Sequence, residues 1–284
     1  MTKLNKLKLI TLSALMTMSE VNADPAKKQD FNHEFMAVLE SFKYHYGEKT
    51  PKQSNFMQDN GVMFGVGGSY ELTYKDRVFL RPEARVAYGF TSYTNYRNSK
   101  YPKASIPNLI FEPRLLVGGN ISLSKTFKLS PYIGLGYRYK SDDGSDLVSE
   151  QNRKLYKRLS QYWYIPVGSR LTYDFTNRWF VKAMAEYNWF ISGRQFSYIK
   201  ERYPSPLVYK QQNGWGAKGE LLVGHRFDRV SIAFGPYMNY WKVGKTPIVT
   251  YSEQDNEGRI YTGGKAREPD NITKEMGVKL NFYF

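Results

Sequence analysis

The stretch Lys274–Phe284, "KEMGVKLNFYF", decides how this chain is interpreted. Its apolar residues share one parity: Met276, Val278, Leu280, Phe282 and Phe284. The other parity carries Glu275, Gly277, Lys279, Asn281 and Tyr283. Alternation with period 2 predicts a β-strand that has one apolar and one polar face. Chain ends usually fray unless they are tied into a sheet, so we expect this strand to pair with another.

The first 23 residues have the layout of a secretory signal peptide. Three lysines precede the apolar run Leu9–Met18, and Val21-Asn22-Ala23 supplies small residues for cleavage. A run of about ten apolar residues is too short to span a bilayer as a helix. The expected division is therefore a signal peptide over 1–23 and one mature domain over 24–284.

The composition fits an exported membrane protein made of strands. The chain of 284 residues has no cysteine, which excludes disulfides and thiol chemistry, and it has 24 tyrosines and 23 glycines. Its mean hydropathy is −0.57, which alone would suggest a soluble protein. Strands that alternate apolar and polar residues average to such values even when one whole face is apolar. Periodicity, not mean hydropathy, must therefore decide the class.

Ten segments show this alternation over ten or more residues. They are 36–46, 61–74, 78–91, 109–122, 128–140, 160–174, 179–192, 214–227, 229–242 and 273–284. Short turns at 75–77, 124–127, 176–178 and 228–229 alternate with long loops near 47–60, 92–108, 141–159, 193–213 and 243–272. This pattern predicts an all-β, transmembrane, antiparallel up-and-down barrel of ten strands, with both termini on the periplasmic, short-turn side. Twelve strands are the alternative if 193–213 and 243–272 hide a further hairpin, for which "PIVTY" at 247–251 is the place to look.

The barrel explains why the chain finishes on a strand. Lipid offers no hydrogen-bond partners to the backbone, so a sheet in the membrane must close on itself. We expect the last strand to pair with the first and expose its apolar parity to lipid. Phe282 and Phe284 then resemble the C-terminal signal that barrel-assembly machinery reads in outer-membrane proteins.

Five prolines fall inside the predicted strands: Pro82, Pro113, Pro131, Pro166 and Pro236. Proline removes a hydrogen bond from the ladder, so it is rare in the middle of a sheet. We interpret these positions as bulges or strand ends.

Charged residues on the polar parity are the main candidates for function. They are Arg81, Glu83, Arg85, Glu112, Arg114, Arg138, Arg170, Lys182, Glu186, Lys218, Glu220 and Lys279. Opposite charges on adjacent strands can pair, and charges removed from bulk water need partners. A ten-stranded barrel is close in size to barrels that side chains fill, which favours a lumen closed by ion pairs. The alternative is a small anion-preferring pore, because bases outnumber acids in this set.

Aromatic and basic residues predict contacts with the membrane. Tryptophan is expected in interfacial girdles, and all five tryptophans lie near predicted loops or turns: Trp163, Trp179, Trp189, Trp215 and Trp241. "RKLYKR" at 153–158 and "KERY" at 200–203 set bases beside aromatics, as lipopolysaccharide phosphates would require, although solvated loop charges explain them equally well. We expect no nucleic-acid partner for an exported barrel despite the net charge of +15.

The sequence contains few of the residue combinations that a barrel enzyme needs for catalysis. Ten-stranded barrel proteases of the omptin family pair acidic residues with an Asp–His couple, but His33, His45 and His225 form no such motif and no facing aspartate pair is apparent. A barrel phospholipase needs a His–Ser couple, for which parity leaves only Ser169 and His225. We therefore expect neither an enzyme nor a metal or cofactor.

Four stretches carry a resemblance to a known group of proteins: "IGLGYRYKSDDGSD", "YWYIPVG", "FVKAMAEYNWFISGRQFSY" and "REPDNITKEMGVKLNFYF". They resemble an uncharacterised family of Gram-negative outer-membrane barrels of porin-like type. The resemblance implies a barrel fold and an outer-membrane location. It implies no substrate and no catalytic residue.

Overall fold

The computed structural model describes residues 30–50, 53–96, 103–145, 147–148, 154–199, 206–254 and 259–284. The predicted signal peptide at 1–23 and the segment 200–203 lie outside these ranges, as does the first residue of 153–158. No helix in the described part of the chain is long and apolar enough to span a membrane.

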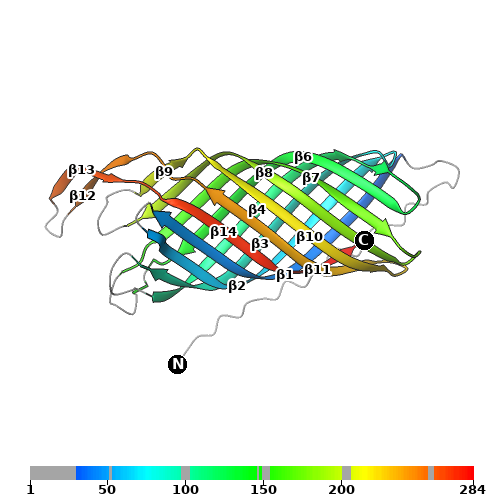
Figure 1. Cartoon of the computed structure of the whole chain (residues 1–284), viewed down its shortest axis with the longest axis horizontal. Helices are drawn as coiled ribbons and strands as arrows, with labels where there is room; N and C mark the ends of the chain where they lie inside the picture. The colour runs from blue at the N-terminus through cyan, green and yellow to red at the C-terminus, as the bar shows by residue number, and fades with distance from the viewer. Residues whose placement is uncertain are drawn as a thin grey trace, which may run out of the picture.

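Ten antiparallel strands form a closed ring, as the sequence predicts (Figure 1). They are β1 (Phe31–Thr50), β2 (Gln53–Tyr74), β3 (Val78–Asn95), β4 (Lys103–Gly119), β6 (Phe127–Asp143), β7 (Lys157–Asp174), β8 (Trp179–Tyr198), β10 (Gly214–Arg226), β11 (Ser231–Val243) and β14 (Asp270–Tyr283). Strand β1 pairs with β2 on one side and with β14 on the other, which closes the ring. A closed ring leaves no unpaired edge, which is the condition for a sheet in lipid.

Four further strands lie outside the ring. The short strands β5 (Ile121–Ser122) and β9 (Leu207–Gln211) pair with β6 and β8 respectively. Strands β12 (Val249–Gln254) and β13 (Ile260–Ala266) form a hairpin that projects beyond one end of the barrel (Figure 1, left). The hairpin anticipated around 247–251 therefore exists but does not enter the ring, so the ring has ten strands and not twelve.

The two barrel ends differ in their connections. We call the end with the short connections, such as 75–77 and 175–178, the inner end, and the opposite end the outer end. At the outer end the predicted loop 47–60 is wrong, because β1 and β2 continue as a paired ribbon to Thr50 and Gln53. Its outward-facing residues, such as Lys43 and Asn60, are polar and exposed. The apolar period that marks a strand in lipid is therefore missing from this ribbon.

The barrel exterior is apolar in a broad band. On β2, Val62, Phe64 and Val66 are 49%, 66% and 57% exposed, and Phe90 on β3 is 59% exposed. Such side chains on a closed antiparallel barrel face lipid, and the band marks the part of each strand that spans the membrane. The outer ends of β1 and β2, beyond Lys43 and Val62, rise above this band.

Four of the five predicted girdle tryptophans point outward. Trp163, Trp179, Trp189 and Trp215 are between 36% and 67% exposed. Trp241 is an exception, since it is only 1% exposed and lies inside the barrel. It shares the parity of Tyr237 and Asn239, which also face inward, so its placement in the girdle was wrong. Parity along β11, not closeness to a loop, decides which way this side chain points.

The prolines interrupt the ladder without shifting it. Around Pro82 the pairing of β3 with β2 lapses between Ser69↔Glu83 and Leu72↔Leu80, yet the register is the same on both sides. The ladders of β4 with β6, β6 with β7 and β10 with β11 lapse similarly beside Pro113, Pro166 and Pro236. Pro131 lies on β6 where its neighbour changes from β4 to β5. The interpretation of these prolines as bulges or strand ends is therefore corrected, because the strands continue through them.

The C-terminal strand is tied in to its last residue. The backbone N–H of Phe284 donates to the carbonyl of Phe35 at 2.9 Å, and the N–H of Phe35 donates back to Phe284 at 3.1 Å. The Phe284 side chain is 63% exposed on the outer surface. The final apolar alternation therefore faces lipid beside the first strand.

Candidate functional site

All twelve side chains of the predicted charge set lie on the inner face of the barrel. The register pairs Glu83 with Arg114 on neighbouring strands, and their side chains form an ion pair at 2.5 Å. Arg85 and Glu112 are also register partners, and Nε of Arg85 lies 3.6 Å from Oε2 of Glu112. Adjacent strands thus contribute the pairs that the sequence suggests.

Other ion pairs cross the lumen between strands that are not neighbours. Arg138 on β6 reaches Glu275 on β14 at 2.5 Å, and Arg114 on β4 reaches Glu186 on β8 at 2.6 Å. Arg85 on β3 also bonds Glu275 at 2.6 Å. These contacts depend on barrel closure, so no pairing of adjacent strands predicts them.

Inward acids missed in the sequence include Glu40, Glu71 and Glu275. Glu275 is fully buried, and Glu71 accepts from Arg81 at 3.3 Å and from Arg170 at 2.7 Å. Both lie on the polar parity of their strands, so the alternation already contained the signal. Glu40 was harder to find because its neighbours on that parity, such as Phe42, are apolar although they face inward.

These acids change the charge balance of the lumen. The predicted set has eight bases and four acids. The other buried charges of the ring strands add two bases, Lys140 and Arg158, and six acids, which gives ten of each; these acids are Glu40, Glu48, Asp59, Glu71, Asp142 and Glu275. The excess of bases on which the anion-selective alternative rested therefore disappears for the buried charges of the ring as a whole. It persists only locally, at the inner end.

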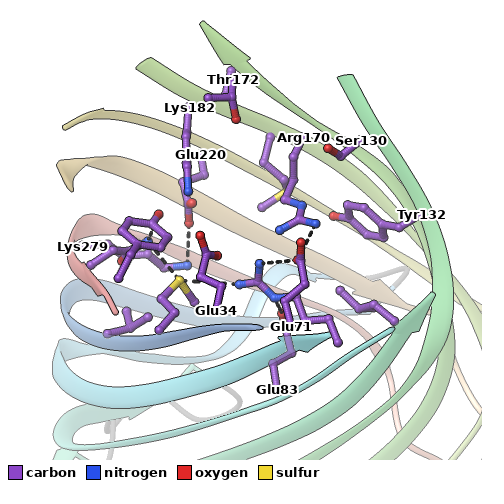
Figure 2. A pocket seen from close by; sticks show the side chains of 18 of the residues that line it. Glu34, Glu71, Glu83, Ser130, Tyr132, Arg170, Thr172, Lys182, Glu220 and Lys279 are labelled. Atoms are coloured by element: carbon purple, nitrogen blue, oxygen red, sulfur yellow. Dashed lines mark hydrogen bonds and ion pairs between the residues drawn. The ribbon is translucent and has the colours of Figure 1, made fainter. Parts of the chain in front are cut away.

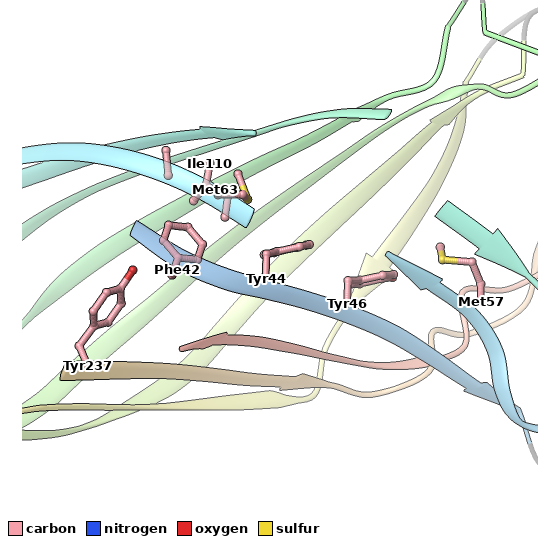
Figure 3. Close-up of a cluster of buried hydrophobic side chains, with 8 residues drawn as sticks. Phe42, Tyr44, Tyr46, Met57, Met63, Ile110 and Tyr237 are labelled. Carbon is pink, nitrogen blue, oxygen red and sulfur yellow. The ribbon is translucent and has the colours of Figure 1, made fainter. Parts of the chain in front are cut away.

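A closing layer fills the middle of the lumen. One aromatic cluster contains Phe42, Tyr44, Met63, Ile110 and Tyr237, all at most 4% exposed (Figure 3). A second contains Tyr162, Tyr164, Phe190 and Trp241, all at most 5% exposed. The ion pairs of Arg85, Glu112, Arg138 and Glu275 join the two clusters.

The contacts within the closing layer are tight. The rings of Tyr164 and Trp241 meet edge to face at 4.9 Å, and the guanidinium of Arg138 lies 5.8 Å from the Trp241 ring. On β10 a Cβ added at Gly216 would lie 2.9 Å from the Trp241 indole, so the glycine makes room for this ring. Side chains of this layer come from nine ring strands, and the tenth, β10, presents this glycine.

The inner vestibule is a charged cavity of about 140 Å³ below the closing layer (Figure 2). Arg81, Arg114, Arg170 and Lys279 line it and pair with carboxylates. Lys182 and Lys218 also line it, and Lys182 lies 3.6 Å from the ring of Tyr283. This cavity is where bases still outnumber acids.

The outer mouth, above the closing layer, is acidic instead. Arg158 on β7 contacts Glu48 at 2.6 Å, Asp142 at 3.2 Å and Asp59 at 3.5 Å. Asp59 and Asp142 are 0% and 4% exposed. The expectation that no aspartates face each other at the outer strand ends is therefore wrong, because one guanidinium holds two of them.

A strap crosses the outer mouth and adds another acid. We define the strap as residues 244–248 and 267–269, where Thr246 and Glu268 exchange two hydrogen bonds. The Glu268 carboxyl is buried beside Glu48, and the Tyr46 hydroxyl donates to Glu48 at 3.0 Å and to Glu268 at 3.5 Å. Burial and the neighbouring Glu48 raise the pKa of Glu268 to about 8. Burial and Asp142 likewise raise the pKa of Asp59, above the lipid band, to about 7.

The histidines do not complete a catalytic group. His45 points outward and its Nδ1 lies 2.7 Å from the Asn60 amide oxygen, while His33 contacts the Tyr70 hydroxyl. Ser169 pairs with Ala185 on β8, whereas His225 pairs with Trp179 on the same strand. Six residues of strand separate these levels by about 20 Å, so the couple required for a phospholipase is not formed.

Comparisons with known proteins show the fold. No family model and no curated protein matches the chain. Among solved structures, the outer membrane protease OmpT from Escherichia coli is similar over 90% of this chain and 97% of its own, with 11% identity and a TM-score of 0.56. Neisserial surface protein A matches with 10% identity over 87% and 95% of the two chains, at a TM-score of 0.32. The toluene transporter TbuX of Ralstonia pickettii matches with 10% identity over 88% of each, at 0.35. At these identities the OmpT likeness supports a transmembrane barrel of the outer-membrane type and says nothing of activity.

Proposed function

We propose that the protein is an integral outer-membrane barrel with a closed lumen, which serves a structural or surface-interaction role. The closing layer carries this proposal. Its side chains are almost fully buried, they come from nine of the ten ring strands, and ion pairs across the lumen fix them. A static layer of this kind blocks passage of hydrated solutes.

Conductance in planar bilayers tests the closed lumen. We expect no steady conductance from the wild-type protein. Trp241→Ala removes an indole from the closing layer and should produce a measurable open state, whereas Trp189→Ala removes an outward indole and should not. Steady, ion-selective current through the wild-type protein would instead support the small anion-preferring pore, whose argument is the basic inner vestibule.

We further propose an outer-membrane location in a Gram-negative cell, with the termini in the periplasm. The apolar band, the outward tryptophans and the likeness to an outer-membrane barrel support this placement. Lipopolysaccharide would contact the bases above the band, and the assembly machinery would read Phe282 and Phe284. A heat-modifiable shift on gel electrophoresis, together with cleavage of intact cells confined to the outer end, tests the location. Recovery in the soluble periplasmic fraction would contradict it.

We propose no catalytic role. The outer mouth brings acids together around Arg158, but no histidine joins them: His45 contacts Asn60, His33 contacts Tyr70 and His225 packs against Trp179. Incubating intact cells with peptide and phospholipid substrates tests this assignment. Turnover that Asp59→Asn abolishes would establish an enzyme.

A further inference from the structure

The inner vestibule contains more hydrogen-bond donors than acceptors. Four carboxylates line it. Glu71, Glu83 and Glu220 are each bound to an arginine or lysine, whereas Glu34 forms no ion pair with another described residue. Glu83 accepts from both Arg81 and Arg114, and Glu71 accepts from both Arg81 and Arg170. The acceptors of the cavity wall are therefore largely committed.

Two lysines of the same wall have no carboxylate partner. Among the described residues, no carboxylate oxygen lies within 4 Å of the amine of Lys182 or of Lys218. The Lys182 amine lies 3.6 Å from the centroid of the Tyr283 ring and 5.5 Å from that of Phe180. Lys218 lines both the 140 Å³ vestibule and a smaller cavity of about 50 Å³ beside it, near Arg114 and Lys279. Cations that line one cavity repel one another, and an anion bound among them reduces that repulsion.

Other polar atoms of the wall also lack partners. Nε of Arg170 and Nδ2 of Asn120 are buried in the wall of the vestibule and have no hydrogen-bond partner. Oδ1 of Asn281 is a buried acceptor in the same wall that also has no hydrogen-bond partner. Buried polar groups are normally satisfied, so two donors without partners beside one cavity favour a ligand that carries acceptor oxygens.

We propose that the inner vestibule is a binding site for a small soluble oxyanion of the phosphate class, held by Lys218 and Lys182. The cavity has room for several water molecules and hence for a tetrahedral anion. Because the closing layer lies above it, the site binds without conducting. It goes beyond the proposed function and does not depend on it.

Thermal melts and isothermal titration of the full-length protein in detergent test the site, with inorganic phosphate as the probe and chloride at equal ionic strength as the reference. We expect phosphate to raise the melting temperature and to bind saturably. Lys218→Gln should weaken phosphate binding at least tenfold, and Lys182→Gln should weaken it less. Lys274→Gln, at an exposed outward position above the lipid band, is the matched control and should bind as the wild type does.

The stability of the unliganded variant separates a binding role from a structural one. Lys218→Gln removes a cation that repels Arg114 and Lys279, so without phosphate its melting temperature should equal or exceed that of the wild type. A lower value, or equal effects of phosphate and chloride on the wild type, would overturn the proposal. Lys182→Gln provides the same test if Lys218→Gln does not fold. Loss of phosphate binding leaves the conductance prediction untouched, and conductance in the wild type leaves the binding result untouched.

Discussion

The inner vestibule and the outer mouth are built from the same ten strands but are filled differently. The vestibule is hollow and basic, whereas the outer mouth is filled and acidic. In the vestibule most cations pair with carboxylates, and some of these carboxylates bind two cations. In the mouth Arg158 contacts three carboxylates, one of which, Asp142, also bonds the buried Lys140. Alternation alone places charges inside a barrel, but the side chains between them decide whether space or packing surrounds those charges.

Aromatic residues on the inward parity cause the difference. Phe42, Tyr44 and Tyr46 follow one another along the inward face of β1 and are at most 3% exposed. On β2, Gly61 faces Tyr44, and Gly65 faces Glu40, where an added Cβ would lie 2.5 Å from the carboxylate. Towards the inner end, β1 presents the smaller side chains Val38 and Met36, which line the cavity. The position of the large rings along one strand thus marks where the lumen closes.

The largest loss of stability is expected from a substitution in the closing layer. Glu275→Gln keeps the volume of the side chain but removes the charge shared by Arg85 and Arg138. Leaving buried cations without their partner costs about 3–5 kcal/mol of the free energy of unfolding. Guanidinium unfolding of the protein refolded into lipid vesicles measures this loss.

The exposed turn residue Asp228 supplies the control, since Asp228→Asn should change stability by less than about 0.5 kcal/mol. Adding Arg138→Met to Glu275→Gln removes one stranded cation and should recover part of the loss. Equal stability of Glu275→Gln and the wild type would mean that water reaches the layer and that the lumen is open.

A smaller loss of stability is expected from a glutamate-to-glutamine substitution in the vestibule wall. Glu83→Gln leaves Arg81 with Glu71 and Arg114 with Glu186, and the Glu83 side chain is already 17% exposed. We expect a loss of about 1–3 kcal/mol, measured by the same unfolding experiment. If Glu83→Gln proved as costly as Glu275→Gln, the contrast between a hollow and a filled half would be wrong.

The sequence predicted the ring and the inward charges because lipid imposes a period of 2 on every strand inside the band. The prediction from sequence failed outside the band, where lipid no longer imposes this period. The ribbon at 47–60 has polar residues on both faces, so it looked like a loop. Trp241 was assigned by its closeness to a loop, although its parity with Asn239 already pointed inward.

Pairs across the lumen could not be predicted at all. Arg138 and Glu275 are 137 residues apart, and Arg158 and Glu48 are 110 apart. Barrel closure and strand tilt bring them together, and neither is encoded in the spacing of residues along one strand. The vestibule cavity was missed for the same reason, since its volume depends on side chains from strands all around the ring.

The smallest effect on the barrel concerns the strap over the outer mouth, which we expect to open as the pH rises. With the strap closed, burial and Glu48 hold the pKa of Glu268 at about 8, against an ordinary value of 4.5 in water. The closed strap therefore binds a proton that the open strap releases. Its stability is full below about pH 4.5, declines between pH 4.5 and about 8, and is constant above that.

Other groups around Glu268 limit this effect and define its control. Arg158 on β7 opposes the rise in the pKa of Glu268 by favouring the charged form. Tyr46 on β1 and Tyr209 on β9 stay neutral in this range, because burial raises the pKa of each. Hydrogen-exchange protection factors of the Thr246 and Glu268 amides, corrected for the intrinsic exchange rate, report strap closure. They should fall between pH 5 and pH 9 in the wild type and stay constant in Glu268→Gln, which keeps a neutral side chain at every pH. Amides of the ring strands should not change in either protein, because the strap lies above the ring and its opening breaks no ladder hydrogen bond. If protection in Glu268→Gln fell as it does in the wild type, Asp59, whose pKa is about 7, would be the group that controls the mouth.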